Sequence, residues 1–210
     1  MASDISFNAY GHPTFTCSFR GELVDTFSLH VPGIHNVSNA LATIALAQKL
    51  GLDAAAIQKG FATFTGTDRR FQYKGTVSGV TVIDDYAHHP TEITATLNAA
   101  ENYPHKTTWC VFQPHTYTRT KALLGDFAQA LTLADKVVLA DIYAAREKNT
   151  IGISSRDLQT EIEKLGTECH YFPTFDEIEN FLLENCESGD LLITMGAGDV
   201  VKIGENLLGQ

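Results

Sequence analysis

Two patterns of hydrophobic and polar residues divide the chain. Near the amino terminus, short stretches alternate between apolar and polar positions and are separated by glycine and proline. This alternation predicts a small antiparallel sheet with strands at Ser6–Tyr10, Thr14–Phe19 and Thr26–Val31. Two helices are expected next. The first is expected to be capped by Asn36, and the second spans about Asp53–Phe61.

From Thr76 onward, apolar runs alternate with longer amphipathic stretches, which is typical of repeated strand–helix units on a mostly parallel sheet. The predicted strands are Val80–Ile83, Trp109–Phe112, Lys136–Ala140, His170–Phe172 and Leu191–Thr194. The predicted helices are Pro90–Asn102, Thr118–Leu131, Ser154–Leu165, Phe175–Asn185 and Asp199–Leu208. We therefore expect an α/β fold, with a boundary at Gly66–Asp68 between residues 1–66 and 67–210.

Composition narrows the class of protein. With 210 residues and 44% apolar content, the chain can bury one sizeable core, or one core and a smaller neighbour. It has no apolar run long enough for a membrane helix and no secretion signal, and its four cysteines are widely separated. Reduced thiols and a cytoplasmic location are expected. A net charge of −10 disfavours extended nucleic-acid binding.

Unusual polar side chains follow the predicted strands at the point where each strand ends. Asp84–His89 follow the first strand, Gln113–Arg119 the second, Asp141–Glu147 the third and Gly196–Asp199 the last. Ligands of parallel sheets bind beyond the carboxyl ends of the strands, where loops and helix amino termini converge. A single site is therefore expected at this edge.

Arg119 gives the clearest physical indication of a ligand. A helix that begins near Thr118 has a partial positive charge at its amino terminus, so a cation in its first turn costs roughly 0.3–1 kcal/mol. A bound anion would remove the conflict, and such local violations tend to mark functional positions. The alternative is a solvated arginine that bends back over the loop.

The acids and histidines of Asp84–Pro90 allow two interpretations. Imidazole and carboxylate groups could hold a metal ion, but no further ligands stand at a recognisable spacing, so no metal site is predicted. A carboxylate that accepts hydrogen bonds from ribose hydroxyls is favoured. Glycines in Gly196–Gly198 indicate phosphate contact only weakly. The two cations Arg69 and Arg70 lie at the expected domain boundary, where ligand clefts often form.

Taken in order, these motifs resemble the Mur ligase family of peptidoglycan synthesis. Gly33–Ala42 is similar to a helix of the family's central, ATP-binding domain, and Arg70–Gln72 matches the arginine motif that begins its third domain. Asp84–Glu92 and Phe112–Thr120 are close to the forms of the L-alanine-adding member, and Thr194–Asp199 ends the domain in the same manner. The resemblance covers essentially the whole chain.

The resemblance implies a fold for each part. Residues 1–66 would be an incomplete α+β part of the central ATPase domain, and residues 67–210 a Rossmann-like, doubly wound ligase domain that binds the amino acid. It also implies a reaction: ATP, with Mg²⁺, phosphorylates the carboxylate of UDP-N-acetylmuramate, and the amine of L-alanine attacks the acyl phosphate. The Mg²⁺ ligands are expected in the part of the central domain that these residues lack.

The resemblance assigns roles to individual residues. His35, Asn36 and Asn39 would approach adenine, Asp85 the ribose and Arg70 the phosphates. The alanine and muramyl side of the cleft would be lined by Tyr86, His88, His115 and Arg119, of which the last three are the expected catalytic residues. Arginine suits a carboxylate because its planar fork makes two charge-assisted hydrogen bonds. Catalysis would rest on positioning and charge stabilisation.

Two departures from the family pattern matter. No G-x-x-G-K-[ST] phosphate-binding loop and no UDP-binding domain occur in these residues, so the chain alone is expected to lack ligase activity. Thr116 stands where some relatives carry an arginine that helps to grip the amino-acid carboxylate. Our hypothesis is that Arg146, one strand further along the same edge, supplies a compensating charge in substrate binding.

Other functions remain open alternatives. The recycling ligase that attaches an intact tripeptide to UDP-N-acetylmuramate shares much of this motif set. A non-catalytic module that binds nucleotide or a protein partner is a second alternative. A dehydrogenase-type dinucleotide domain is disfavoured, because no G-x-G-x-x-G follows the strand at Val80–Ile83.

Overall fold

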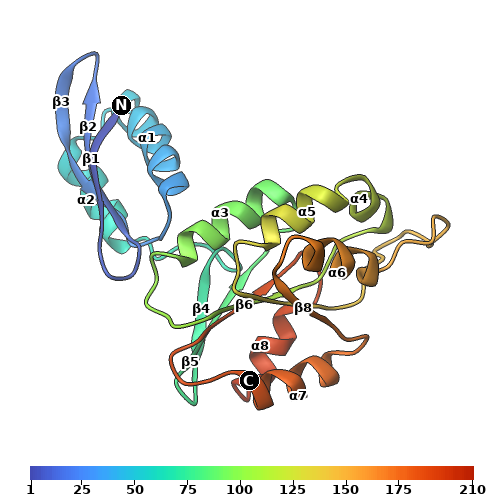
Figure 1. Cartoon of the computed structure of the whole chain (residues 1–210). Helices are drawn as coiled ribbons and strands as arrows, with labels where there is room; N and C mark the ends of the chain where they lie inside the picture. The colour runs from blue at the N-terminus through green and yellow to red at the C-terminus, as the bar shows by residue number, and fades with distance from the viewer. The chain divides into compact units, whose positions relative to one another are not determined.

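The computed structural model describes residues 1–210, and these form two compact units (Figure 1). One consists of Met1–Thr67 and Asn98–Pro104, and the other of Asp68–Leu97 and His105–Gln210. None of the helices combines the length and apolar character that a membrane span requires. All four cysteines are free thiols.

The first unit contains the small antiparallel sheet and the two helices that the sequence predicts. Its elements are β1 (Ala2–Phe7), β2 (Pro13–Phe19), β3 (Glu22–Ser28), α1 (Ile34–Lys49) and α2 (Ala54–Thr63). The strands pair in the order β1-β2-β3. Alternate residues of β2 are buried, and its Phe15 joins Phe27, Val37, Ile44 and Ile57 in one core. Alternation along the strand thus marks the face that the helices cover.

The first and third strands each begin four residues before the predicted positions. The first strand also ends early, at Phe7, because the Asn8 side chain accepts hydrogen bonds from the backbone N–H groups of Tyr10 and His12 and forms a turn there. The third strand begins early because Arg20 and Gly21, with φ of 52° and 87°, form a two-residue hairpin turn.

The prediction that Asn36 caps the first helix is wrong. Helix α1 begins at Ile34, and Gly33, with φ of 95°, takes the cap position without a side-chain hydrogen bond. Asn36 lies inside the first turn, where its Nδ2 donates to the carbonyl oxygen of Pro32 at 2.7 Å. The asparagine therefore stabilises the turn that precedes the helix.

The second unit is a six-stranded mixed sheet with helices between the strands. Its strands are β4 (Gln72–Val77), β5 (Val80–Asp85), β6 (Thr108–Phe112), β7 (Lys136–Leu139), β8 (Glu168–Tyr171) and β9 (Leu191–Met195). Its helices are α3 (Pro90–Ala100), α4 (Tyr117–Ala122), α5 (Leu124–Leu131), α6 (Ser155–Lys164), α7 (Phe175–Asn185) and α8 (Val201–Leu207). The order is β4-β5-β9-β6-β7-β8, and only β4 is antiparallel to its neighbour. The predicted α/β fold and all five predicted parallel strands are confirmed.

Helices cover both faces of this sheet, as expected for a doubly wound fold. Figure 1 shows α3 and α5 on one side of the strands and α7 and α8 on the other. Every residue of β6 and β9 is buried. Val111 and Leu192 from these strands pack with Ile178 of α7 and Ile203 of α8. Burial on both faces explains why the strands are continuous apolar runs in the sequence.

Two features of this unit differ from the prediction. Strand β4 was not expected, because as an edge strand it is only partly buried and has no apolar run. Ser78 and Gly79, with φ of 51° and 81°, form the two-residue turn that joins it to β5. The helix predicted at Thr118–Leu131 is divided into α4 and α5 at Leu123, whose φ of −113° is not helical.

The register of the parallel strands brings their carboxyl ends to one level. Met195 of β9 pairs with both Asp85 of β5 and Phe112 of β6. Phe112 pairs in turn with Leu139 of β7. Each of these residues is the last of its strand, so the polar loops that follow leave the sheet at the same edge.

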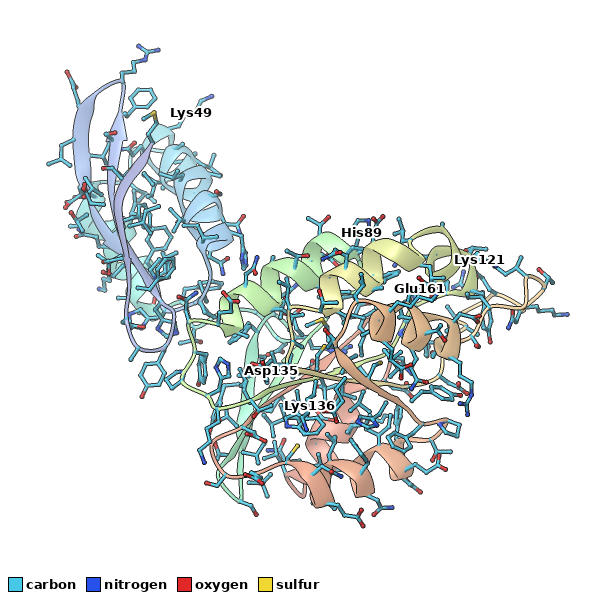
Figure 2. All side chains as sticks on the ribbon, viewed as in Figure 1. Lys49, His89, Lys121, Asp135, Lys136 and Glu161 are labelled. Atoms are coloured by element: carbon cyan, nitrogen blue, oxygen red, sulfur yellow. The ribbon has the colours of Figure 1, made fainter.

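Polar contacts also fix the opposite, amino end of the sheet. The Thr108 N–H donates to Asp135 Oδ2 at 2.7 Å, just before β7. Lys136 Nζ lies 4.7 Å from the ring of Trp109, whose indole N–H donates to Asp190 Oδ2 at 3.0 Å. Figure 2 marks Asp135 and Lys136 at this end. These contacts are structural and lie at the edge opposite the polar loops.

Candidate ligand site at the carboxyl edge of the sheet

A buried ion pair joins the end of β5 to the loop that follows β9. Arg69 Nε donates to Asp84 Oδ2 at 2.9 Å, and the Asp84 side chain is fully buried. The same guanidinium donates to the carbonyl oxygens of Gly196 at 2.7 Å and Gly198 at 3.2 Å. Thr194 Oγ1 donates to the other Asp84 oxygen at 2.8 Å. Arg69 is therefore a structural residue, and not a solvated part of a linker.

Asp85 is also engaged within the protein. Its Oδ2 accepts from the Phe71 N–H at 2.8 Å and from Thr96 Oγ1 at 3.0 Å, and its Oδ1 accepts from the Ala87 N–H at 2.8 Å. Burial raises the pKa of Asp85, and these hydrogen bonds together with the charge of Arg70 oppose the shift. Asp85 thus anchors the arginine-bearing segment, and its expected contact with a ribose stays a prediction.

Four aromatic and imidazole rings form a continuous row along the edge. The ring centroids are 5.4 Å apart for Tyr86 and His88, 5.8 Å for His88 and His115, and 5.6 Å for His115 and Tyr143. The guanidinium of Arg69 lies 4.8 Å from the Tyr86 ring. The structure therefore brings Tyr86, His88 and His115 together, as expected, and adds Tyr143. Only the position of Tyr143 after the third predicted strand could have indicated it.

The neutral tautomer of His88 follows from its surroundings. His88 Nδ1 lies 3.0 Å from the carbonyl oxygen of Tyr86, which can only accept a hydrogen bond. Glu92 Oε2 is 3.4 Å from the same nitrogen and accepts from the His88 backbone N–H at 3.0 Å. Nδ1 therefore carries the proton of the neutral ring, and Nε2 keeps its lone pair. Such a nitrogen can accept a proton.

The loops after β6 and β7 are joined by hydrogen bonds. The Tyr143 N–H donates to the Pro114 carbonyl oxygen at 2.8 Å, and the Thr116 N–H donates to the Tyr143 carbonyl oxygen at 2.9 Å. The Thr118 N–H donates to Glu147 Oε2 at 2.9 Å, and the Thr118 hydroxyl donates to Glu147 Oε1. The first turn of α4 is thus held by the loop after β7.

This arrangement removes the reason for which the sequence favoured a bound anion at Arg119. The carboxylate of Glu147 already accepts from the first turn of α4, so the protein itself supplies a negative charge at that helix end. A different feature of Arg119 indicates a ligand. Its Nη1 is buried and has no hydrogen-bond partner.

All the buried side-chain nitrogen and oxygen atoms without a partner lie on the segment from the end of β6 to α4. They are Gln113 Oε1, His115 Nδ1 and Arg119 Nη1. Leaving such an atom unpaired costs about 1–3 kcal/mol. Burial lowers the pKa of His115, the charges of Arg119 and His88 lower it further, and Glu147 opposes them. Three groups on this segment can therefore form hydrogen bonds with a polar ligand. They are the neutral imidazole of His115, the guanidinium of Arg119 and the amide oxygen of Gln113.

The glycine-rich loop after β9 packs tightly against this segment. A Cβ atom on Gly198 would lie 2.2 Å from Gln113 Oε1 and 3.0 Å from the Tyr143 ring, so a larger residue would displace the Gln113 side chain. Gln113 Nε2 donates to Asp199 Oδ1 at 3.3 Å. Gln113 was not among the predicted site residues, although it directly follows an apolar run. The predicted phosphate contact of the glycines stays a prediction.

Arginines are concentrated at this edge, together with several carboxylates. Five of the six arginines of the sequence lie in loops or first helical turns here, namely Arg69, Arg70, Arg119, Arg146 and Arg156. The Arg70 side chain is 54% exposed and lies 3.9 Å from Glu92. Arg146 is exposed and directly precedes Glu147. Exposed or unpaired arginine groups are therefore available to an anionic ligand, whereas Arg69 is paired with Asp84.

The residues expected near adenine lie in the first unit, in the first two turns of α1. His35 and Asn39 are exposed and Asn36 is half-buried. Asn39 Nδ2 donates to Asn36 Oδ1 at 3.0 Å. The positions 35, 36 and 39 fall on one side of the helix. Their role in adenine binding stays a prediction.

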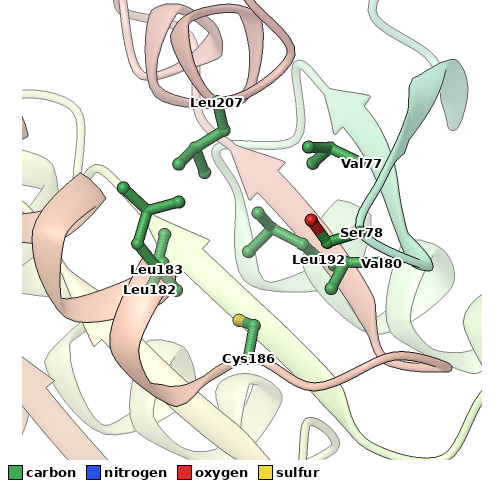
Figure 3. A pocket seen from close by; sticks show the side chains of 8 residues that line it. All are labelled: Val77, Ser78, Val80, Leu182, Leu183, Cys186, Leu192 and Leu207. Carbon is green, nitrogen blue, oxygen red and sulfur yellow. The ribbon is translucent and has the colours of Figure 1, made fainter.

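The structure has an apolar pocket, but this pocket does not lie at the carboxyl edge, and the side chains there form no metal-binding cluster. No group of three or more histidine, cysteine, aspartate and glutamate side chains could hold a metal ion. The pocket in Figure 3 lies at the opposite end of the strands and is lined by Val77, Ser78, Val80, Leu182, Leu183, Cys186, Leu192 and Leu207. Burial raises the pKa of Cys186 to about 12, so its thiol stays protonated.

Comparisons with known proteins agree along the whole chain. A family model described as "Mur ligase, glutamate ligase domain" matches residues 69–198. UDP-N-acetylmuramate–L-alanine ligase from Lachnospira eligens is 59% identical over 207 residues, which are 99% of this chain and 45% of that protein. The enzyme of the same name from Agathobacter rectalis is 60% identical over 205 residues, 98% of this chain and 45% of that protein. The chain spans less than half the length of these curated relatives.

Solved structures give the same result. The crystal structure of UDP-N-acetylmuramate–alanine ligase from Thermotoga maritima has a TM-score of 0.85 and 29% identity, and the match covers 99% of this chain and 44% of that chain. A murein peptide ligase from Psychrobacter arcticus has a TM-score of 0.66 and 27% identity, and the match covers 99% of this chain and 43% of that chain.

Replacement of Arg69 by methionine tests the structural ion pair. Arg69→Met keeps the aliphatic stem but leaves Asp84 buried and unpaired, and we expect it to lower the free energy of unfolding by about 3 kcal/mol. Urea unfolding followed by the fluorescence of Trp109, the one tryptophan, measures the second unit. Arg70→Met is the control, since its exposed neighbouring position should change stability by about 0.5 kcal/mol or less. Equal effects of the two substitutions would contradict the structural role.

Proposed function

Because the chain belongs to the Mur ligase family, we propose that it supplies the carboxy-terminal, amino-acid-binding part of an ATP-dependent ligase. The reaction would join L-alanine to UDP-N-acetylmuramate in peptidoglycan synthesis. One observation carries the proposal: the buried polar atoms without partners all lie on the segment that ends at Arg119, beside the row of rings. The names of the matched relatives supply the substrate, and the unpaired Nη1 of Arg119 fits the charge of its carboxylate.

Arg119 is the proposed ligand of the alanine carboxylate. Its unpaired Nη1 can make a charge-assisted hydrogen bond with a carboxylate oxygen. His115 is half-buried beside it, with a lowered pKa that favours the neutral ring, so it can hydrogen-bond to substrate without adding charge. Tyr86 would line the same side, where its ring continues the row. A small amino acid would thus be oriented before it reacts.

His88 is the proposed acceptor of the amine proton. L-Alanine has an ammonium group, which must lose a proton before its nitrogen can attack an acyl phosphate. The proton would pass to His88 Nε2, whose lone pair is kept free because Nδ1 faces the Tyr86 carbonyl oxygen. The neutral amine then forms the amide bond, and phosphate leaves with the electrons of the bond that breaks.

Roles in ATP binding are proposed residue by residue. Arg70 is exposed enough to meet its phosphates, Asp85 lies next to that arginine and is assigned to the ribose, and His35, Asn36 and Asn39 are assigned to adenine. Mg²⁺ would neutralise phosphate charge during the transfer. Because no cluster of metal-ligating side chains occurs here, we assign no Mg²⁺ ligand to this chain. A cytoplasmic location is proposed with this function.

The tripeptide-adding ligase is the second candidate. The solved murein peptide ligase is similar over the same length, but its structural match is poorer than that of the alanine ligase. A non-catalytic nucleotide-binding module would bind ATP and UDP-N-acetylmuramate without turnover. Substrate choice and turnover therefore separate the three functions.

A chimera tests the proposed function. In it, this chain replaces the matching part of the Lachnospira eligens enzyme, which is 59% identical to it. We expect the chimera to release phosphate from ATP only when UDP-N-acetylmuramate and L-alanine are both present, and the 210-residue chain alone to remain inactive. Product analysis with L-alanine and with tripeptide identifies the accepted substrate. Preference for tripeptide, or nucleotide binding without turnover, would reject the proposal.

Substitution of Arg146 tests whether its charge compensates for the arginine that is absent at position 116, where this chain has Thr116. If its charge helps to hold the alanine carboxylate, Arg146→Ala in the chimera should raise the KM for L-alanine roughly 3- to 10-fold, since one charge-assisted contact is lost. The KM for ATP should stay unchanged. Lys148→Ala removes another exposed cation from the same loop and serves as the control. An unaltered KM for L-alanine would reject the compensating role.

A further inference from the structure

Glu147 has no role in the proposed function, yet it contacts the segment on which that function depends. It lies in the loop after β7, eight residues beyond the end of that strand at Leu139. Both of its carboxylate oxygens accept from Thr118, one from the backbone N–H at 2.9 Å and one from the hydroxyl. Hydrogen bonds from the Thr118 hydroxyl and backbone lower the pKa of Glu147, so it is ionised at neutral pH.

Thr118 lies between the two residues that the proposed function needs most. His115 stands three positions before it and Arg119 one position after it. The turn between them is stiff, because Thr120 Oγ1 donates to the Thr116 carbonyl oxygen at 2.7 Å and the Thr120 N–H donates to the same oxygen at 3.1 Å. A displacement of Thr118 would therefore move both His115 and Arg119.

The charge of Glu147 also acts on this segment. Thr118 holds both carboxylate oxygens of Glu147, so this negative charge stays close to His115 and Arg119. The charge of Glu147 raises the pKa of His115 and so opposes the effects of Arg119 and His88 on that pKa.

We propose that Glu147 is a positioning residue of the amino-acid site, which holds Thr118 and thereby sets the directions of His115 and Arg119. The inference rests on the proposed function, because that function gives His115 and Arg119 their ligand. The loop after β7 would thus take part in the site by its carboxylate as well as by the ring of Tyr143.

NMR spectroscopy of the 210-residue chain tests the influence of Glu147 on both side chains without any substrate. We expect Glu147→Gln to shift the titration of His115 to lower pH, because the negative charge that opposes Arg119 and His88 is lost. The Nε–H signal of Arg119 should move as well, because the carboxylate that holds the neighbouring Thr118 is changed. Glu177→Gln is the matched control: Glu177 accepts from the hydroxyl of Thr174 at 2.7 Å and from its N–H at 3.2 Å at the start of α7. It should leave both signals unchanged.

Kinetics of the chimera provide the second arm. Glu147→Ala should raise the KM for L-alanine roughly 3- to 10-fold with little change in the KM for ATP, and Glu147→Gln, which keeps an acceptor oxygen for Thr118, should restore part of the loss. If Glu147→Gln leaves the His115 titration and the Arg119 signal unchanged, the positioning role is wrong, whatever the activity. If the unsubstituted chimera is inactive, the proposed function fails, and the NMR result still decides whether Glu147 sets the two side chains.

Discussion

The buried ion pair between Arg69 and Asp84 is the interaction on which the arrangement of the carboxyl edge depends. Asp84 has no access to solvent, so its charge requires the guanidinium beside it. That guanidinium also binds two carbonyl oxygens of the loop after β9, and this loop packs through Gly198 against Gln113 and the ring of Tyr143. One arginine thereby connects the ends of β5 and β9 with the segments that carry the candidate ligand-binding groups.

The polar groups at this edge are of two kinds: some are hydrogen-bonded within the protein, and others have no partner there and can bind a ligand. Asp84, Asp85 and Arg69 make several hydrogen bonds inside the protein, and Glu147 does so at the start of α4. Arg119 Nη1 and His115 Nδ1 do not. Because these unpaired groups are cationic and neutral imidazole, they match the carboxylate and the hydrogen-bonding needs of a small amino acid better than they match a metal ion or an apolar ligand. The proposed alanine site is therefore placed at the polar groups that have no hydrogen-bond partner inside the protein.

Much of the fold could be predicted from the sequence, because β5, β6, β7 and β9 are almost entirely buried and therefore appear as apolar runs. Strand β4 could not, since its edge position demands no such run, and Asn36 was misplaced because a preceding carbonyl oxygen competes for its side chain. At the site, the positions of the predicted strands indicated which loops meet at the carboxyl edge. They did not indicate which side chains form hydrogen bonds or ion pairs within those loops. Arg69 and Arg70 are identical neighbours in sequence, and only tertiary structure separates the half-buried arginine that pairs with Asp84 from the exposed one. Likewise, Glu147 lies 28 positions after Arg119, so nothing in the sequence near α4 indicates that Glu147 contacts this helix.

The central claim is that Arg119 binds the carboxylate of the amino acid. It is tested most directly by the KM values of the chimera after Arg119→Met, which removes the charge and keeps most of the aliphatic stem. Loss of a charge-assisted hydrogen bond should raise the KM for L-alanine at least about tenfold, while the KM for ATP stays within about twofold. An unchanged KM for L-alanine, or an equal rise for both substrates, would contradict the account.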